Sequence, residues 1–222
     1  MNFPAETLRF LRALKRNNRR EWFEAHRGDY ESYVRQPMTA IVERLAVDLR
    51  GFAPELVASP KISMYRIYRD TRFSDNKTPY KTHVAAVFPT RGLPKHEGAG
   101  AYFQIAPDGV WIGGGMYMPQ PAQLLAVREQ IATHLRQLRA IVESPAFRKQ
   151  FGALDGDRLT RVPRGFAKDH PAAEYLKYKH FVAGADFPPT LATSPAFYKT
   201  LLTAFRQITP LTRFLNAPLL KS

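Results

Sequence analysis

The chain has 222 residues, of which 45% are hydrophobic and 12% aromatic, so it has enough apolar material for a folded core and is not a disordered polypeptide. It contains no cysteine, which excludes disulfides, thiolate metal sites and cysteine nucleophiles. The formal net charge of +14 favours anionic partners, although a basic chain can also carry its charge on solvated outer helix faces.

We expect a single α+β domain over residues 1–222, with an antiparallel sheet of four to five strands packed against helices from both ends. The helical N-terminal part covers 1–50, the sheet core 61–118, and a second helical part with a fifth strand 121–222. No apolar run reaches the roughly 18–20 residues that span a bilayer, and the charged N-terminus lacks the apolar stretch of a secretory signal. The cytoplasm is therefore the expected location.

Apolar residues at helical spacing predict three helices in the first fifty residues. The stripe from Phe3 to Leu14 predicts a helix that ends near Asn17-Asn18. A second helix begins at about Arg19, and a third covers 37–49. We interpret these helices as packing elements.

Strands are predicted after the break at residues 51–60. The predicted strands at 99–106 and 110–118 form a hairpin around Pro107-Asp108-Gly109, with Tyr102, Gln104 and Ala106 on one face. The run Gly113-Gly114-Gly115 predicts a bulge, or a ligand or packed aromatic side chain close to the backbone. The four predicted strands are residues 61–68, 82–89, 99–106 and 110–118.

The remaining chain is predicted to be mainly helical. A long helix follows from 121 to about 143, and Ser144-Pro145 and Ser194-Pro195 are typical starts of two more. Between these, Arg164-Gly165-Phe166 indicates a turn and Asp169-His170-Pro171 a helix start, while 178–183 is the candidate fifth strand.

The main candidate site lies between Lys61 and His83, where six lysines and arginines face only two aspartates. Arginine binds oxyanions with two parallel hydrogen bonds and lysine as a point charge, so the segment predicts a site for a phosphorylated small molecule. Strand alternation places Arg66 and Arg69 on opposite faces, so one pocket can hold both only if the strand ends at Tyr68. The candidate ligand-binding residues are Arg66, Arg69, Asp70, Arg72, Lys77, Tyr80, Lys81 and His83, joined by Arg164, Lys168 and His170.

Several alternatives stay open for these residues. The arginines can instead form an internal ion-pair network with Asp70 and Asp75, or an interaction surface for nucleic acid or protein. Asp70 with Asp75-Asn76-Lys77 weakly resembles the acid-x-Lys element of metal-dependent nucleases. The histidines lack metal-ligand spacing, and no phosphate loop or nucleophile motif occurs, so no metal or cofactor is indicated.

Four stretches carry a resemblance to a known family. They are RIYRDTRFSDNKTPYKTH at 66–83, NNRREWFEAHR at 17–27, the hairpin at 102–119 and VPRGFAKDHPAAEYLKYK at 162–179. Over nearly its whole length the chain resembles a widespread bacterial and fungal family catalogued as a domain of unknown function. The resemblance implies a single α+β domain and brings no activity, substrate or catalytic residue.

Overall fold

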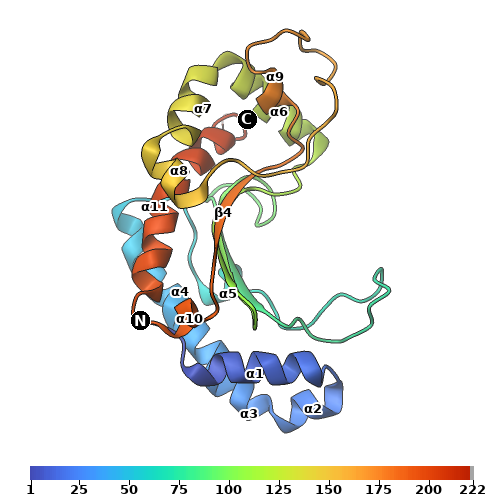
Figure 1. Cartoon of the computed structure of the whole chain (residues 1–222), viewed down its shortest axis with the longest axis vertical. Helices are drawn as coiled ribbons and strands as arrows, with labels where there is room; N and C mark the ends of the chain where they lie inside the picture. Colours follow the sequence, from blue (N-terminus) through green and yellow to red (C-terminus); the bar gives the residue numbers. More distant parts are fainter. Residues whose placement is uncertain (221–222) are drawn as a thin grey trace.

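The computed structural model, which describes residues 1–220, contains one four-stranded antiparallel sheet with helices around it (Figure 1). The strand order is β1-β2-β3-β4, so neighbours in the sheet are also neighbours in the sequence order of strands. This confirms the predicted α+β class. The strands are β1 Val84–Pro89, β2 Gly100–Ile105, β3 Val110–Met116 and β4 Phe181–Phe187.

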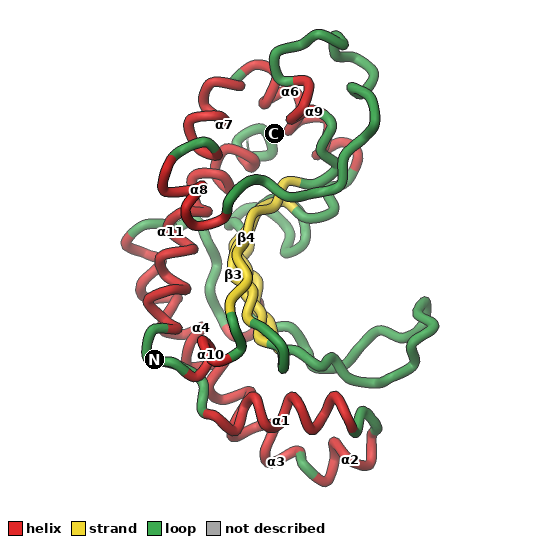
Figure 2. Tube along the Cα trace, in the orientation of Figure 1, coloured by secondary structure: helices red, strands yellow, loops and turns green. Residues whose placement is uncertain are grey.

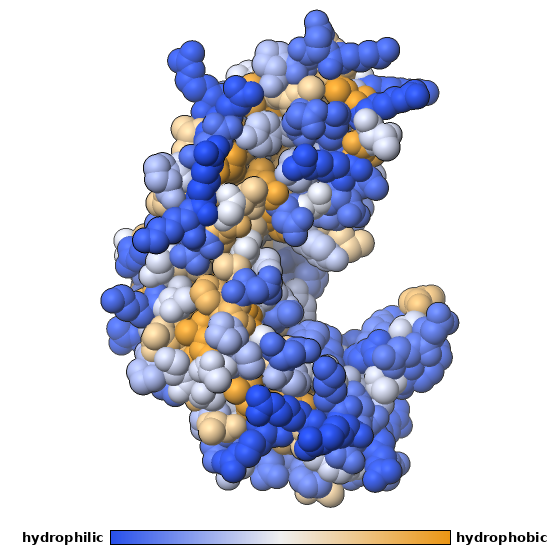
Figure 3. Space-filling view, viewed as in Figure 1, coloured by the Kyte–Doolittle hydropathy of each residue, from blue (hydrophilic) through white to orange (hydrophobic). Residues whose placement is uncertain are grey.

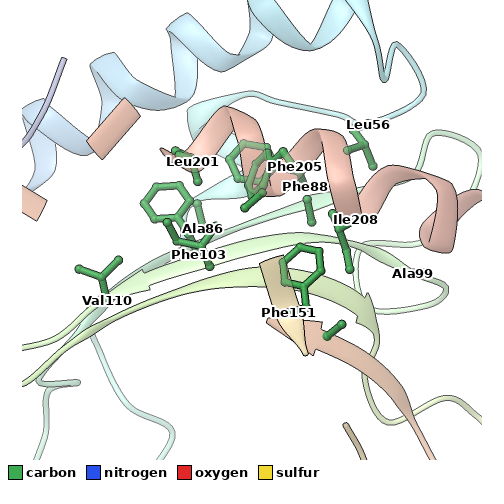
Figure 4. Close-up of a cluster of buried hydrophobic side chains, with 14 of the residues drawn as sticks. Leu56, Ala86, Phe88, Ala99, Phe103, Val110, Phe151, Leu201, Phe205 and Ile208 are labelled. Carbon is green, nitrogen blue, oxygen red and sulfur yellow. The ribbon is translucent and has the colours of Figure 1, made fainter. Parts of the chain in front are cut away.

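One face of the sheet carries the hydrophobic core and packs against the long C-terminal helix α11 (Phe197–Asn216). Alternation along the strands turns Phe88, Phe103 and Ile112 to this side, where each is fully buried. Phe88 contacts Phe205 of α11 with ring centroids 5.2 Å apart (Figure 4). The predicted separation of the two faces of β2 is confirmed, because Ala101, Phe103 and Ile105 are buried and Tyr102 and Gln104 are half-buried.

The N-terminal helices form one end of the molecule. They are α1 (Ala5–Arg16), α2 (Arg20–Ala25), α3 (Arg27–Tyr30), the π-helical segment η1 (Glu31–Arg35), α4 (Gln36–Asp48) and the short 3₁₀ turn η2 (Leu49–Gly51). Pro37 has no amide hydrogen to donate to the carbonyl of Tyr33 one turn earlier. The hydroxyl of the buried Thr7 donates to that carbonyl instead, which ties α1 to the π-helical segment.

The other end is built from α6 (Pro121–Thr133), α7 (Leu135–Val142), α8 (Pro145–Phe151) and α9 (Ala173–Leu176), while α10 (Thr190–Thr193) follows β4. The predicted cap of α8 is confirmed, because the Ser144 hydroxyl accepts from the Phe147 amide at 3.2 Å. With the sheet between them, the two ends give the molecule a C-shaped outline (Figure 2). None of the helices between residues 1 and 220 is long and apolar enough to cross a membrane.

Three predicted elements need correction. The strand at 61–68 is wrong: Ser59 caps a helical turn, α5 (Pro60–Ser63), by accepting from the Ile62 amide at 3.3 Å, and Pro60 fits the first helical position. The helix predicted over 121–143 is two helices, because His134 leaves helical geometry and its carbonyl accepts bonds that start α7. The predicted fifth strand at 178–183 is β4, the fourth strand, and begins three residues later.

Candidate functional site

The face of the sheet opposite α11 is open and lies on the inner side of the C (Figures 1 and 3). Strand register brings Val87, Tyr102 and Gly113 side by side on this face, with Gln104 and Trp111 in the neighbouring row. A cavity of about 820 Å³, hereafter the sheet cavity, lies over this face and is lined by Val87, Tyr102, Gln104 and Trp111. Its lining also includes Tyr65, Lys81, His83, Lys95, His96 and Tyr117.

Glycines on this face allow Trp111 to lie flat on the sheet. A methyl group added to Gly184 would come within 2.0 Å of the indole Cζ2. One added to Gly113 would meet the Ala183 carbonyl oxygen at 2.1 Å and the indole Cη2 at 2.8 Å. Gly113 and Gly184 are paired residues of β3 and β4, so the indole covers backbone where side chains would otherwise stand. Within the glycine run, added methyl groups would first meet the carbonyl oxygens of the neighbouring strands, and the expected packed aromatic side chain is present at Gly113, whereas a ligand close to the backbone stays a prediction.

Two lysines converge on one aromatic ring at the wall of the sheet cavity. The Nζ atoms of Lys81 and Lys95 lie 5.0 and 4.8 Å from the ring centroid of Tyr65. Tyr65 stacks on His96 at 5.9 Å and meets Tyr102 edge-on at 6.3 Å. None of the residues lining this cavity carries a carboxylate, and none of the ion pairs within residues 1–220 includes either lysine.

Burial and mutual repulsion perturb the titratable groups of this wall. Partial burial lowers the pKa of Lys81, and the nearby charges of Arg66 and Lys95 lower it further. Burial also lowers the pKa of Lys95, and burial with the Lys81 charge lowers that of His83. Burial raises the pKa of the Tyr65 phenol. The cavity wall therefore holds positive charge that an anion would compensate.

The loop between β1 and β2, which carries Lys95 and His96, is held by the end of α11. Asn216, which is only 1% exposed, accepts from the Ala99 amide at 2.7 Å and donates to the Ala99 carbonyl at 2.9 Å. It also donates to the Thr90 hydroxyl at 2.8 Å. The buried asparagine thus fixes both ends of this loop from a distant part of the chain.

Residues 66–81 form a second feature, hereafter the arm, which projects from the body past the open face (Figure 1). Its base is a narrow antiparallel ladder, in which Arg69 donates to the Pro79 carbonyl at 2.9 Å and the Lys81 amide to Ile67 at 2.8 Å. The Asn18 side chain exchanges two hydrogen bonds with the Tyr80 backbone, and the Tyr80 ring, 2% exposed, stacks on Phe23 at 4.2 Å. Tyr80 therefore anchors the arm.

Polar side chains of the arm mostly bond within it. Arg69 donates to Thr78 at 2.7 Å and to Ser74 at 3.2 Å. Arg72 forms a two-point ion pair with Asp70, whose pKa these hydrogen bonds lower to about 2. The Arg72–Asp70 pair is an ion pair of the kind that the internal-network alternative predicts. Arg69 bonds to hydroxyl groups instead, and Lys77 Nζ donates to the Thr71 carbonyl at 3.1 Å.

The structure distributes the predicted site residues over several places. Only Lys81 and His83 line the sheet cavity. Arg69, Lys77 and Tyr80 line a polar depression of about 790 Å³ that they share with Arg19 and Arg20 of the N-terminal part. Arg66 lines a third depression of about 600 Å³.

The second predicted cluster lies apart from these cavities. Arg164, Lys168 and His170 belong to the segment between α8 and α9, and none of them lines any of the three cavities. The Nδ1 atom of His170 accepts from the Ala172 amide at 3.0 Å, which is a local turn contact. The ligand-binding role predicted for these three residues, as for those of the arm, stays a prediction.

Sequence reasoning did not assign Lys95, Trp111 or Gln104 to a site. The signal for Trp111 was present, because it precedes Gly113 by two residues and so shares its face of the strand. Lys95 gave no local signal, since its contact with Tyr65 joins residues thirty positions apart and depends on the tertiary fold.

The family model described as "Conserved hypothetical protein (DUF2461)" matches residues 6–214, which is most of the chain. The chain belongs to the DUF2461 family. This confirms the resemblance to a conserved family of unknown function. No curated protein and no solved structure matches the chain, so the DUF2461 comparison brings no named activity. Among residues 1–220, no group of three or more histidine, aspartate or glutamate side chains could hold a metal ion.

Proposed function

We propose that this protein binds a small anionic ligand, with phosphate the best fit, in the sheet cavity. The observation that carries the proposal is the pair of lysines, Lys81 and Lys95, on one tyrosine ring in a cavity without a lining carboxylate. Two positive charges that repel each other in a half-buried wall cost stability unless a ligand compensates them. His83, adjacent in the lining, adds a donor whose charge rises when an anion binds.

A thermal-shift and calorimetric titration with inorganic phosphate, pyrophosphate and ribose 5-phosphate tests this proposal. A ligand that binds the folded state raises the melting temperature by mass action, and we expect such a rise in the wild type. We expect Lys81→Met and Lys95→Met each to abolish it. Lys199→Met is the matched control, because it removes an equal charge from an exposed position that lies outside the cavity and belongs to none of the predicted sites.

Two results would contradict the proposal. One is the absence of any shift with the three phosphates in the wild type. The other is an equal loss in Lys199→Met, which would mean that the ligands respond to the overall charge of +14 and not to the cavity.

The second candidate function is a nucleic-acid interaction domain that uses the arm. Phe73 is 94% exposed there, and the Arg72 guanidinium lies 5.6 Å from its ring centroid. An exposed aromatic ring beside an arginine fits base stacking along a single strand. If single-stranded RNA binds with steep salt dependence, and Phe73→Ser weakens it while Lys81→Met does not, this candidate replaces the first.

A further inference from the structure

The indole of Trp111 has one face on the backbone and the other toward the sheet cavity. Gly113 and Gly184 leave the space in which the ring lies flat, and Trp111 itself lines the cavity. A large aromatic ring with an accessible face is a stacking surface for a planar group of a ligand. Nothing about anion binding alone requires such a surface.

An aromatic path connects this surface to the lysines. The ring of Trp111 lies 5.7 Å from that of Tyr102, which lies 6.3 Å from that of Tyr65, the ring that Lys81 and Lys95 approach. Tyr102 thus contacts both the stacking surface and the ring at the positive wall. A ligand that engages both is expected to carry a spacer between its planar ring and its anionic group.

We propose that the ligand of the sheet cavity carries a planar ring joined through a spacer of sugar size to its anionic group, as in a mononucleotide. The ring stacks on Trp111, and the anionic group lies at Lys81 and Lys95. The side chain of Gln104, which lies in the same row as Trp111 and lines the cavity, offers amide groups for the polar edge of the ring. This inference rests on the proposed function and specifies the ligand class of the same site.

Tryptophan fluorescence provides a direct test, because the chain has only two tryptophans. The other one, Trp22, stacks on His26 in the N-terminal helices at 4.1 Å. In Trp22→Phe protein, all tryptophan emission comes from Trp111. We expect adenosine 5′-monophosphate to change this emission on saturation, and ribose 5-phosphate and inorganic phosphate to leave it nearly unchanged.

Affinity measurements in variants give the second readout. Stacking of a base on an aromatic side chain contributes about 1–3 kcal/mol, which corresponds to roughly a 5- to 150-fold change in affinity. We expect Trp111→Leu to lower the affinity for the mononucleotide by that factor and to leave the affinity for ribose 5-phosphate unchanged. Gly184→Ala, which keeps the indole but displaces it from the sheet, should act in the same direction.

The outcomes separate the two proposals. Equal affinities for the mononucleotide and ribose 5-phosphate, with unchanged Trp111 emission, would overturn the stacking inference and leave the anion site standing. If none of the phosphates binds, both proposals fail together. If only long oligonucleotides bind, and Trp111→Leu does not weaken them, the mononucleotide class is wrong and the nucleic-acid interface takes its place.

Discussion

The packing that holds Trp111 on the sheet predicts a strong energetic coupling between this residue and Gly184. An alanine at 184 would place its methyl group 2.0, 2.4 and 2.6 Å from three atoms of the indole, so the ring must move. Overpacking of this kind costs about 1–3 kcal/mol. Replacing a glycine by alanine where the backbone allows it gains about 0.4–1 kcal/mol, and Gly184 is not among the glycines with positive φ.

We therefore expect Gly184→Ala to lower the free energy of unfolding by about 1 kcal/mol in the wild type and to raise it slightly in the Trp111→Ala background. The coupling, about 2 kcal/mol, corresponds to roughly 4–8 °C in melting temperature for a domain of this size. Urea unfolding followed by far-ultraviolet circular dichroism measures all four proteins without relying on tryptophan. Gly28→Ala, whose methyl group would meet nothing within 4 Å, is the control for the alanine effect itself.

A double-mutant cycle without coupling would refute the packing argument. If Gly184→Ala lowers the free energy of unfolding equally with and without Trp111, the indole does not lie on that glycine in solution. The proposed stacking surface would then be wrong.

Three further predictions follow from contacts described above. Asn216→Ala leaves the buried Ala99 amide without its acceptor, while the Ala99 carbonyl keeps the bond from the Thr90 hydroxyl, and should cost about 1–3 kcal/mol of unfolding free energy in urea titrations; a loss below about 1 kcal/mol would contradict the role of Asn216 in holding this loop. The pKa of His83 is lowered from 6.5 in the folded protein, so the unfolded chain binds more protons between the two values and stability is lost as the pH falls through this range. His83→Gln should remove that loss, and Lys81→Met should raise the His83 pKa in an NMR titration; an unchanged pKa would mean that the two side chains do not interact. Arg69→Ala should leave the global melting temperature nearly unchanged and speed tryptic cleavage within the arm. If this variant also loses the phosphate-induced rise in melting temperature, the arm takes part in binding and the assignment to the sheet cavity alone is wrong.

Local sequence signals predicted the parts of the fold that local physics determines. Ser144-Pro145 starts a helix because a serine hydroxyl and a proline both suit the first turn, and the turn at Pro107-Asp108-Gly109 joins two strands with the expected faces. The same physics explains the main error. Residues 61–68 have strand-forming side chains, but Ser59 and Pro60 start a helical turn that interrupts the pattern.

The candidate site was only partly predictable because contacts between distant parts of the chain assemble it. Lys81 and His83, which were predicted from their place in a basic segment, line the sheet cavity, whereas most other cations of that segment lie in the arm or in other depressions. Lys95 reaches Tyr65 through a loop that Asn216 holds from more than a hundred residues away. No spacing in the sequence reports such a contact.

The covering of the sheet by α11 has a consequence for how the chain folds during synthesis. The strands that bury Phe88 and Phe103 are complete well before residues 197–216 have been made. Until α11 is made and docks, the apolar side of the nascent sheet is exposed to water. The same side is exposed in any polypeptide that is truncated before α11. Docking of α11 is therefore expected as a late, rate-limiting event, because contacts such as that of Asn216 with Ala99 span 117 positions of chain. Ribosome-bound intermediates lacking this helix should be the species that chaperones engage.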